Sequence, residues 1–283
     1  MISHSQDNTS ERVILAVAPN GARKMKTDHS LLPMSASEIA IDAARCRDAG
    51  ASLLHLHVRD KAGHHSLNTD LYREAIAAVR RSINEDLLIQ ITTESAGIFA
   101  PDEQMECVRS VKPEAVSLAI KELAPDEAAI PVASSFFDWL WNERILAQYI
   151  IYTPKELNWF LNLVKRGVVP GATHFLQFVL GRYSENQQSS LEDLEGFLAL
   201  PSESYHWSVC AFGKNEQSCV LGAIAKGGHA RVGFENNIFL PNGQKAPDNA
   251  ALVQGIADSI PASGRLLADG RQTRELLVNT LKS

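Results

Sequence analysis

Short apolar stretches alternate with longer amphipathic stretches along the whole chain. The apolar stretches are rich in β-branched residues and continuously apolar, which is typical of a parallel sheet covered on both faces. This pattern predicts eight strands, at residues 13–17, 52–58, 87–92, 115–119, 148–152, 175–180, 207–212 and 230–234. The intervening stretches predict helices near residues 36–49, 69–83, 101–111, 135–147, 154–167, 190–200, 214–226, 247–260 and 271–281.

Several helix boundaries carry their own signals. Ser35 and Thr153 are each followed three residues later by a glutamate, the pattern of a capping box. Pro154 suits the first position of a helix, where a missing N–H costs nothing. Gly50 and Gly167 follow the last helical residues, where glycine commonly ends a helix.

The strict alternation of strands and helices predicts an α/β protein with a closed (β/α)8 TIM barrel. An open, doubly wound sheet is the alternative. It is the weaker one because the first strand-to-helix turn, residues 18–22, lacks the glycine pattern of a dinucleotide-binding site. Because no linker or composition shift interrupts the chain, we expect one catalytic domain at residues 13–283 after a flexible tail at residues 1–12.

Composition narrows the range of partners. Of the 283 residues, 45% are hydrophobic and 21% charged, which suits a globular protein with a large core. A net charge of −6 argues against nucleic acid as a partner, because phosphate binding needs a basic face. No apolar stretch reaches the about 18 residues of a membrane span, and we expect a cytoplasmic protein. The four cysteines form no CxxC pair, and we expect them to be reduced and structural.

His55 and His57 are the strongest candidate ligands in the sequence. Residues two apart on a strand point the same way, so the two imidazoles converge where the second strand ends. Such a pair suits zinc or a similar divalent metal. The local pattern is equally compatible with two core histidines that are satisfied by hydrogen bonds.

The last strand supplies a third ligand. In a closed barrel, the second and eighth strands both neighbour the first, about 10 Å apart, so Glu235 can meet the two imidazoles over it. Three protein ligands leave a fourth position open, which is the catalytic pattern. Arg231 lies four residues before Glu235, on the same face, and an ion pair between them is the alternative explanation of the glutamate.

The other strand ends carry softer candidates, because barrel sites are built from several of them. The hydroxyls of Thr92, Thr93 and Ser117 could bind a carboxylate, although such residues are ordinary there. Lys214, after the seventh strand, could meet an anionic cofactor, although it is a solvated charge by default. Seven further histidines are expected to have no part in the chemistry: those at 4, 29, 64 and 65 on the surface, and those at 174, 206 and 229 at strand beginnings.

Three motifs point to one family. His-Leu-His-Val-Arg spans residues 55–59, Phe-Val-Leu-Gly spans 178–181, and Gly-Gly-His-Ala-Arg-Val-Gly-Phe-Glu-Asn-Asn spans 227–237. Together they resemble the β-keto acid cleavage enzyme family, over nearly the whole chain. The resemblance implies a zinc-dependent, homotetrameric transferase on a TIM barrel. Such an enzyme condenses a β-keto acid with acetyl-CoA and yields acetoacetate and a shortened acyl-CoA by a retro-Claisen route.

The resemblance also implies roles by position. The two histidines and Glu235 match the metal ligands, and Thr92 and Thr93 match the hydroxyl pair that holds the substrate carboxylate. Arg231 matches an arginine that organises the catalytic carboxylate. In the family that carboxylate is an Asp, which takes the proton from the acetyl-CoA methyl; here the position is Asn236, which cannot accept a proton at neutral pH.

Two further departures alter the expected chemistry. The Gly-Gly that follows the hydroxyl pair in the family is Glu94-Ser95 here, so Glu94, and after it Glu122, is the candidate base. A glutamate used in the first loop for an amino-bearing substrate aligns near Arg23, which predicts neutral or anionic substrates. Two alternatives stay open: a metal-dependent hydrolase, which would need more histidine ligands than the strand ends supply, and a metal-binding homologue with altered or lost activity.

Overall fold

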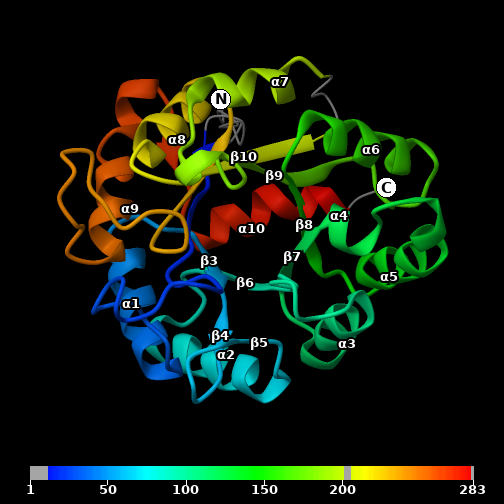
Figure 1. Cartoon of the computed structure of the whole chain (residues 1–283), viewed down its shortest axis with the longest axis horizontal. Coiled ribbons are helices and arrows are strands. Elements are labelled where there is room, and N and C mark those ends of the chain that lie inside the picture. Colours follow the sequence, from blue (N-terminus) through cyan, green and yellow to red (C-terminus); the bar gives the residue numbers. More distant parts are fainter. Residues whose placement is uncertain (1–11, 201–204, 282–283) are drawn as a thin grey trace, which may run out of the picture.

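The computed structural model describes residues 12–200 and 205–281, and it confirms the (β/α)8 barrel. Eight strands close in the order β2-β3-β6-β7-β8-β9-β10-β11, and every neighbouring pair is parallel (Figure 1). The barrel strands are β2 (Leu15–Val17), β3 (Leu53–Leu56), β6 (Leu88–Thr92), β7 (Ala115–Ala119), β8 (Leu146–Ile151), β9 (His174–Leu180), β10 (Tyr205–Ala211) and β11 (His229–Val232). Each overlaps a strand predicted from the sequence.

Helices surround the barrel, and one crosses its amino-terminal end. The outer helices are α1 (Ala36–Asp48), α2 (Thr69–Ile83), α3 (Pro101–Val111), α4 (Ile120–Leu123), α5 (Ile130–Asn142), α6 (Pro154–Lys165), α7 (Glu195–Leu198), α8 (Glu216–Ala225) and α9 (Asn249–Ala257). Figure 1 shows α10 (Gly270–Val278) running across the barrel opening. Of the helices that the structure describes, none is long and apolar enough to cross a membrane.

Short elements complete the fold. Single 3-10 turns occupy Glu127–Ala129, Glu185–Gln187, Leu191–Leu194, Ile260–Ser263 and Asn279–Leu281. A small antiparallel pair, β4 (Val58–Arg59) with β5 (His65–Ser66), follows β3. Arg12, which falls in the predicted tail, pairs with Leu266 in a second small sheet of β1 (Arg12–Val13) and β12 (Leu266–Leu267); residues 1–11 lie outside the described residues.

Two predicted helices differ from the structure. The helix expected at 135–147 begins and ends earlier, at Ile130 and Asn142, because Pro131 fits the first turn and residues from Leu146 on already belong to β8. The helix expected at 190–200 is a 3-10 turn followed by the four residues of α7. The capping box at Ser35 is present, whereas Glu156 bonds the backbone N–H of Tyr152 instead of that of its own cap residue.

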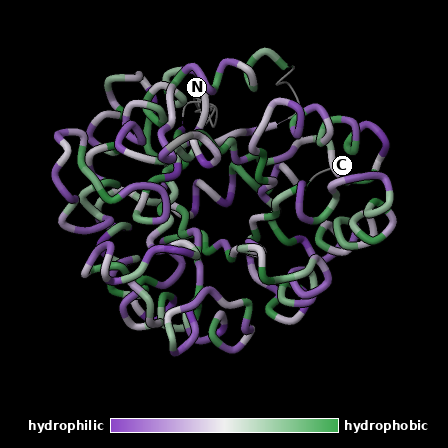
Figure 2. Tube along the Cα trace, in the orientation of Figure 1, coloured by the Kyte–Doolittle hydropathy of each residue, from purple (hydrophilic) through white to green (hydrophobic). Residues whose placement is uncertain are grey.

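The barrel interior is layered from an apolar end to a polar end. The amino-terminal layer packs against Leu276 and Leu277 of α10 and consists of Ile14, Ala16, Leu53, Leu88, Ala115, Leu146 and Phe175. The main core lies between the strands and the outer helices, and Figure 2 shows hydrophobic positions gathered around the barrel. All four cysteines are free and buried. Because α10 closes one end, the carboxyl end is left for a site.

Candidate metal and substrate site

His55, His57 and Glu235 meet at the carboxyl end of the barrel, as expected if the second and eighth strands flank the first. His55 lies in β3, His57 follows it directly, and Glu235 comes three residues after β11; β2 separates these two strands. The Nε2 atoms of the two histidines lie 3.2 Å apart, and Glu235 Oε2 lies 3.5 Å from His55 Nε2 and 3.2 Å from His57 Nε2. Their ligand atoms all lie within 4.8 Å of one another, so they could hold one metal ion.

Glu235 fits both explanations that the sequence left open, because it faces the two histidines and also forms an ion pair with Arg231. Its Oε2 faces the histidines, while its Oε1 accepts a hydrogen bond of 3.0 Å from Arg231 Nη2. Burial alone would raise the pKa of Glu235, but Arg231 and then the two histidines outweigh it and hold that pKa well below its usual range. The glutamate is therefore ionised and has one oxygen free for a cation.

A chain of amides fixes the orientation of His55. Its Nδ1 lies 2.8 Å from Gln90 Oε1, and Gln90 Nε2 in turn donates to Gln148 Oε1 at 3.0 Å. Gln148 Nε2 then donates to Ser208 Oγ at 2.8 Å. Because each amide nitrogen donates onward, Gln90 Oε1 is left to accept from His55 Nδ1, and the Nε2 lone pair points to the site. Burial, and after it the charge of Arg231, lowers the pKa of His55 to about 3, so the imidazole is neutral.

Three buried side chains shape the turn that carries Glu235. Glu216, 1% exposed at the start of α8, accepts hydrogen bonds from the backbone N–H of Gly233 and from Asn237 Nδ2, both at 3.2 Å. Burial raises the pKa of Glu216 to about 8. Asn249 accepts from the backbone N–H of Phe234 at 2.8 Å. These contacts tie the turn to α8 and α9, and the sequence reading missed them.

The first loop holds the site from the side of β2. Asn20 Nδ2 donates to the carbonyl of His57 at 3.2 Å, and Arg59 donates to the carbonyls of Asn20 and Gly21. Gly21 has φ +61°, and a Cβ there would lie 2.5 Å from Cγ of Glu235. A side chain at Gly21 would therefore displace the glutamate, which explains glycine at this position.

A cavity is lined by two of the three candidate ligands, His55 and Glu235. Its apolar wall comprises Ala119, Ile150, Tyr152, Val179 and Phe212, and its polar wall comprises His55, Thr92, Glu94, Ser117, Glu122, Arg182, Arg231 and Glu235. Ser117 Oγ is buried and has no hydrogen-bond partner among the described residues. Thr92 Oγ1 accepts from the backbone N–H of Glu94 at 3.1 Å, which leaves its own proton to donate into the cavity. Two hydroxyl donors thus face the space beside the candidate metal ligands.

Glu94 stands where this cavity meets an outer cleft. The cleft is lined by Asn20, Gly21, Ala22, Arg23, Lys24, Asp28, Glu94, Arg182, Gln187 and Glu235. Glu94 Oε1 lies 3.4 Å from Arg182 Nη2, and both side chains are partly exposed. Glu122 is more constrained, because its oxygens accept hydrogen bonds from the backbone and hydroxyl of Ser95 and from Gln104. Lys24 donates to the carbonyl of Glu235 at 2.8 Å, and burial lowers its pKa.

Three residues singled out in the sequence lie outside both spaces. Thr93 is buried in the wall, where its hydroxyl donates to the carbonyl of Ser117 at 3.0 Å. Asn236 is 3% exposed, and its side-chain amide lacks a hydrogen-bond partner within the described parts of the chain. Lys214 is exposed. The structure therefore gathers Thr92, Ser117 and the charged candidates, but not these three, at the cavity and cleft.

Two of the histidines expected on the surface are buried. His29 is 6% exposed, and its Nε2 lies 2.8 Å from the carbonyl oxygen of Ala246. His65, 5% exposed, packs its ring 5.2 Å from that of His57. Both predictions were wrong because His29, in the first loop, and His65, in the short strand β5, contact residues far away in the sequence, which a local pattern does not indicate. His64 is exposed as expected, and His4 lies outside the described residues.

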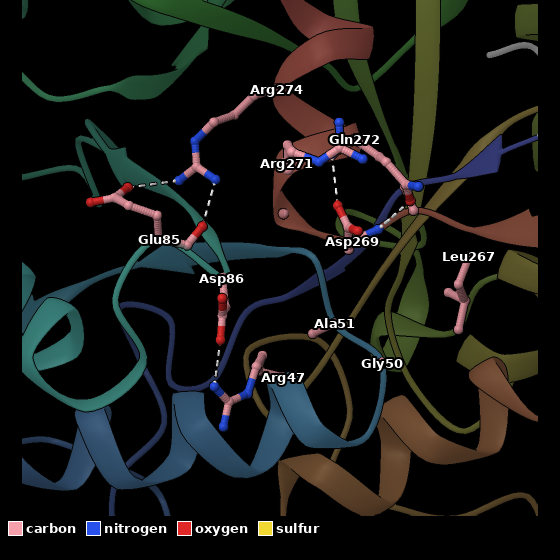
Figure 3. Close-up of a pocket in the computed structure, with 12 residues that line it drawn as sticks. Arg47, Gly50, Ala51, Glu85, Asp86, Leu267, Asp269, Arg271, Gln272 and Arg274 are labelled. Carbon is pink, nitrogen blue, oxygen red and sulfur yellow. Dashed lines mark hydrogen bonds and ion pairs between the residues drawn. The ribbon is translucent and has the colours of Figure 1, made fainter. Parts of the chain in front are cut away.

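A wide cleft opens at the amino-terminal end of the barrel (Figure 3). Its arginines carry ion pairs: Arg47 Nη1 lies 2.6 Å from Asp86 Oδ2, and Arg274 Nη2 lies 3.2 Å from Glu85 Oε2. In the part of the chain that the structure covers, the only cluster able to hold a metal is the one at the carboxyl end. The candidate chemistry therefore lies at the carboxyl end.

Comparison with known proteins supplies the context of the site. The profile of one family, described as beta-keto acid cleavage enzyme, matches residues 12–278. A 3-keto-5-aminohexanoate cleavage enzyme of Acetoanaerobium sticklandii is 28% identical over 273 residues, which cover 94% of this chain and 98% of the relative. A 3-oxoadipate:acetyl-CoA acetyltransferase of Cupriavidus necator is 27% identical and covers 93% of this chain and 94% of the relative.

Solved structures add support for the fold. A ternary complex of ObcA with a C4-CoA adduct and oxalate superposes with a TM-score of 0.68 at 16% identity, covering 87% of this chain and 67% of that one. A type I 3-dehydroquinate dehydratase from Clostridium difficile superposes with a TM-score of 0.57 at 10% identity, covering 87% of this chain and 92% of that one. At such low identity these likenesses bear on the barrel alone.

Proposed function

This chain belongs to the beta-keto acid cleavage enzyme family, and we propose that it is a zinc-dependent member that transfers a neutral or anionic acyl group from a β-keto acid to CoA. Membership makes it a C–C bond-cleaving transferase, and the relatives' names point to a keto acid and acetyl-CoA as co-substrates. The convergence of His55, His57 and Glu235 beside a cavity with free hydroxyls is the observation that carries the proposal.

The donor set suits zinc or a similar divalent ion. Two imidazoles and one carboxylate with a free oxygen are typical catalytic zinc ligands. His55, His57 and Glu235 would hold the ion, which when bound supplies a Lewis acid for the β-keto oxygen. Arg231 keeps Glu235 ionised and fixed by its hydrogen bond of 3.0 Å.

The hydroxyls orient the substrate. Thr92 and Ser117 present donors to the cavity next to His55, where a carboxylate would place the keto carbon near the ligands. Thr93, which aligns with the family's second hydroxyl, would support Ser117 through its carbonyl rather than touch the substrate. Asn236, next to Glu235, lies outside the cavity, and its neutral amide would not act as a base.

Atom balance fixes the order of bond changes. A carbanion at the acetyl-CoA methyl would lead to a β-ketoacyl-CoA and acetate, so the proton must instead leave C2 of the β-keto acid. That carbon attacks the acetyl thioester, and CoA thiolate leaves. The thiolate then adds to the original keto carbon, the C2–C3 bond breaks, and C2 regains a proton. The products are acetoacetate and the new acyl-CoA, with no redox change.

Glu94 is our candidate for the base that takes the proton from C2. It lines both the cavity and the outer cleft, and its partner Arg182 keeps it oriented at 3.4 Å without burying it. Glu122, the second candidate, is engaged by three hydrogen bonds from Ser95 and Gln104, so its oxygens are less free to reach the substrate.

Cations in the outer cleft favour a substrate without a positive charge. Arg23, Lys24 and Arg182 line the cleft beside Glu94, and Arg23 is exposed to any group that enters. An ammonium on the substrate would meet like charge there, whereas a neutral or carboxylate end would not. Lys214, in the neighbouring loop after β10, remains our candidate for contact with the phosphates of CoA. A cytoplasmic location and a homotetramer are further expectations from the family.

Incubation of the purified protein with acetyl-CoA and a panel of β-keto acids tests the proposal. We expect mass spectrometry to detect acetoacetate and one acyl-CoA for neutral or dicarboxylate substrates. An amino-substituted substrate preferred over these would contradict the assignment of the cleft, and Arg23→Glu should shift preference toward it. Bound zinc without any acyl-CoA product, for every acid in the panel, would contradict the enzymatic proposal.

A further inference from the structure

His65 contacts both the candidate metal ligand His57 and the backbone of Glu94, the candidate base. It is 5% exposed, and its ring centroid lies 5.2 Å from that of His57 and 5.7 Å from that of Phe99. His65 Nε2 lies 2.8 Å from the carbonyl oxygen of Glu94. A carbonyl oxygen only accepts, so Nε2 carries the proton and Nδ1 of the same ring bears a lone pair.

His57 presents the complementary nitrogen. Its Nε2 lies in the cluster that could hold a metal, 3.2 Å from Glu235 Oε2. With a metal bound, that nitrogen would be the ligand atom, and the proton of the ring would then lie on Nδ1. His57 Nδ1 and His65 Nδ1 are both buried, and neither has a hydrogen-bond partner in residues 12–200 and 205–281. Buried polar atoms are nearly always paired, and here an N–H and a lone pair are left over in neighbouring rings.

We propose that His65 is a positioning residue that accepts a hydrogen bond from His57 Nδ1 through one ordered water, while it donates to the carbonyl of Glu94. This rests on the proposed function, because it concerns the same metal ligand and the same base. His65 then fixes the tautomer of His57 as Gln90 fixes that of His55, and it holds the backbone that carries Glu94. One imidazole thus links the metal ligands to the base.

Three substitutions separate the two contacts. His65→Phe keeps a ring against Phe99 but loses both nitrogens. His65→Asn places a side-chain oxygen near the position of Nδ1, so it keeps an acceptor for His57 and loses the contact with Glu94. His65→Gln places an amide nitrogen near the position of Nε2, so it keeps the bond to the Glu94 carbonyl and loses the acceptor for His57.

Zinc affinity is measured with the metal alone, by competition with a chromophoric chelator. We expect a loss of about tenfold or more for the Phe and Gln variants and a value near the wild type for Asn, because partners of metal ligands contribute on that scale. Turnover of the zinc-saturated proteins should instead fall in the Phe and Asn variants and be retained in Gln. Melting temperatures identify any variant that has simply lost its fold.

Equal zinc affinity in the wild type and in a folded Phe variant would overturn the inference and leave the proposed function standing. Equal losses in all three variants would also overturn it, because packing alone would then account for them. If the wild type binds no zinc, the metal centre of the proposed function fails and this inference fails with it.

Discussion

The two ends of the barrel bury the same types of residue in different ways. At the amino-terminal end, His229 Nδ1 accepts a hydrogen bond of 3.1 Å from the backbone N–H of Ile14, and His174 Nε2 lies 3.2 Å from the carbonyl oxygen of Pro170. At the carboxyl end, His55 and His57 converge on Glu235, and polar atoms of the site lack partners in the described chain. Burial of a histidine therefore does not indicate chemistry; convergence with a free carboxylate oxygen does.

The largest effect should come from the carboxyl end. Glu235→Ala removes one of the three candidate ligands and leaves Arg231 without its partner. We expect zinc to be lost and kcat/KM to fall on the order of a thousandfold, because Lewis-acid stabilisation supplies several kcal/mol. Zinc analysis and acyl-CoA assays check this. An active variant without metal would show that the histidines at the carboxyl end, like those at the amino-terminal end, are not metal ligands needed for activity.

Glu94→Gln tests the base without disturbing the metal ligands. The amide keeps the size of the side chain and cannot take a proton, so we expect kcat to fall about a hundredfold or more while zinc stays bound. Glu122→Gln is the matched control, since that carboxylate is already engaged by hydrogen bonds. Unchanged turnover in the Glu94 variant would exclude it as the base.

Gln90→Leu tests whether the hydrogen-bonded chain of Gln90, Gln148 and Ser208 contributes to metal binding at the site. The leucine keeps most of the volume but cannot accept from His55 Nδ1, so the tautomer of the imidazole is no longer fixed. We expect zinc affinity to fall about tenfold, measured by chelator competition, with a smaller effect on kcat at saturating zinc. The carboxylate of Gln90→Glu should retain the affinity. A leucine variant with wild-type zinc affinity would show that Gln90 does not orient His55 for metal binding.

His229→Phe should change stability and leave chemistry intact. It removes the acceptor for the N–H of Ile14, and an unpaired buried N–H costs about 1–3 kcal/mol. Urea unfolding should show that loss, whereas zinc affinity and kcat/KM should stay at wild-type values. His229→Asn, which keeps an acceptor, should be less destabilised. Loss of zinc in the Phe variant would break the comparison between the two ends.

The pH dependence of stability should differ between the wild type and the His229→Phe variant. Burial, and after it Arg265, lowers the pKa of His229 to about 3, below its unfolded value of about 6.5. The unfolded chain therefore takes up the proton first, so stability falls as pH drops from about 6.5 toward 3, by up to about 1.4 kcal/mol per pH unit from this group. His229→Phe should show a shallower slope in that window. Parallel slopes would mean that His229 is not buried as a neutral ring.

Most of the fold could be predicted from the sequence, because strands covered on both faces leave a strong local signal. Helix α5 begins at Ile130 rather than at residue 135, because Pro131 fits its first turn. The convergence of Glu235 with the two histidines could be predicted as well, since strand period and barrel closure are enough to bring them together.

The surroundings of these ligands could be predicted only in part, because some of them depend on segments that fold back over the barrel. Nothing local to His65 indicates that β5 folds back against the ring of His57. Gln90 and Gln148 did leave a signal, since a glutamine inside an apolar strand must find a partner within the barrel. Glu216 left none, because an acidic residue at a helix start is ordinary at the surface.

The candidate ligands lie at the carboxyl ends of the two strands that flank β2, where the last barrel strand rejoins the first. A break in the turn between α5 and β8 would give one fragment with both histidines and another with the glutamate. Neither fragment could assemble the site, and only their reassociation could restore it. Zinc binding would then report that the two fragments have reassociated. Because the ion would bind only the reassociated barrel, it would also favour that form over the separate fragments by mass action.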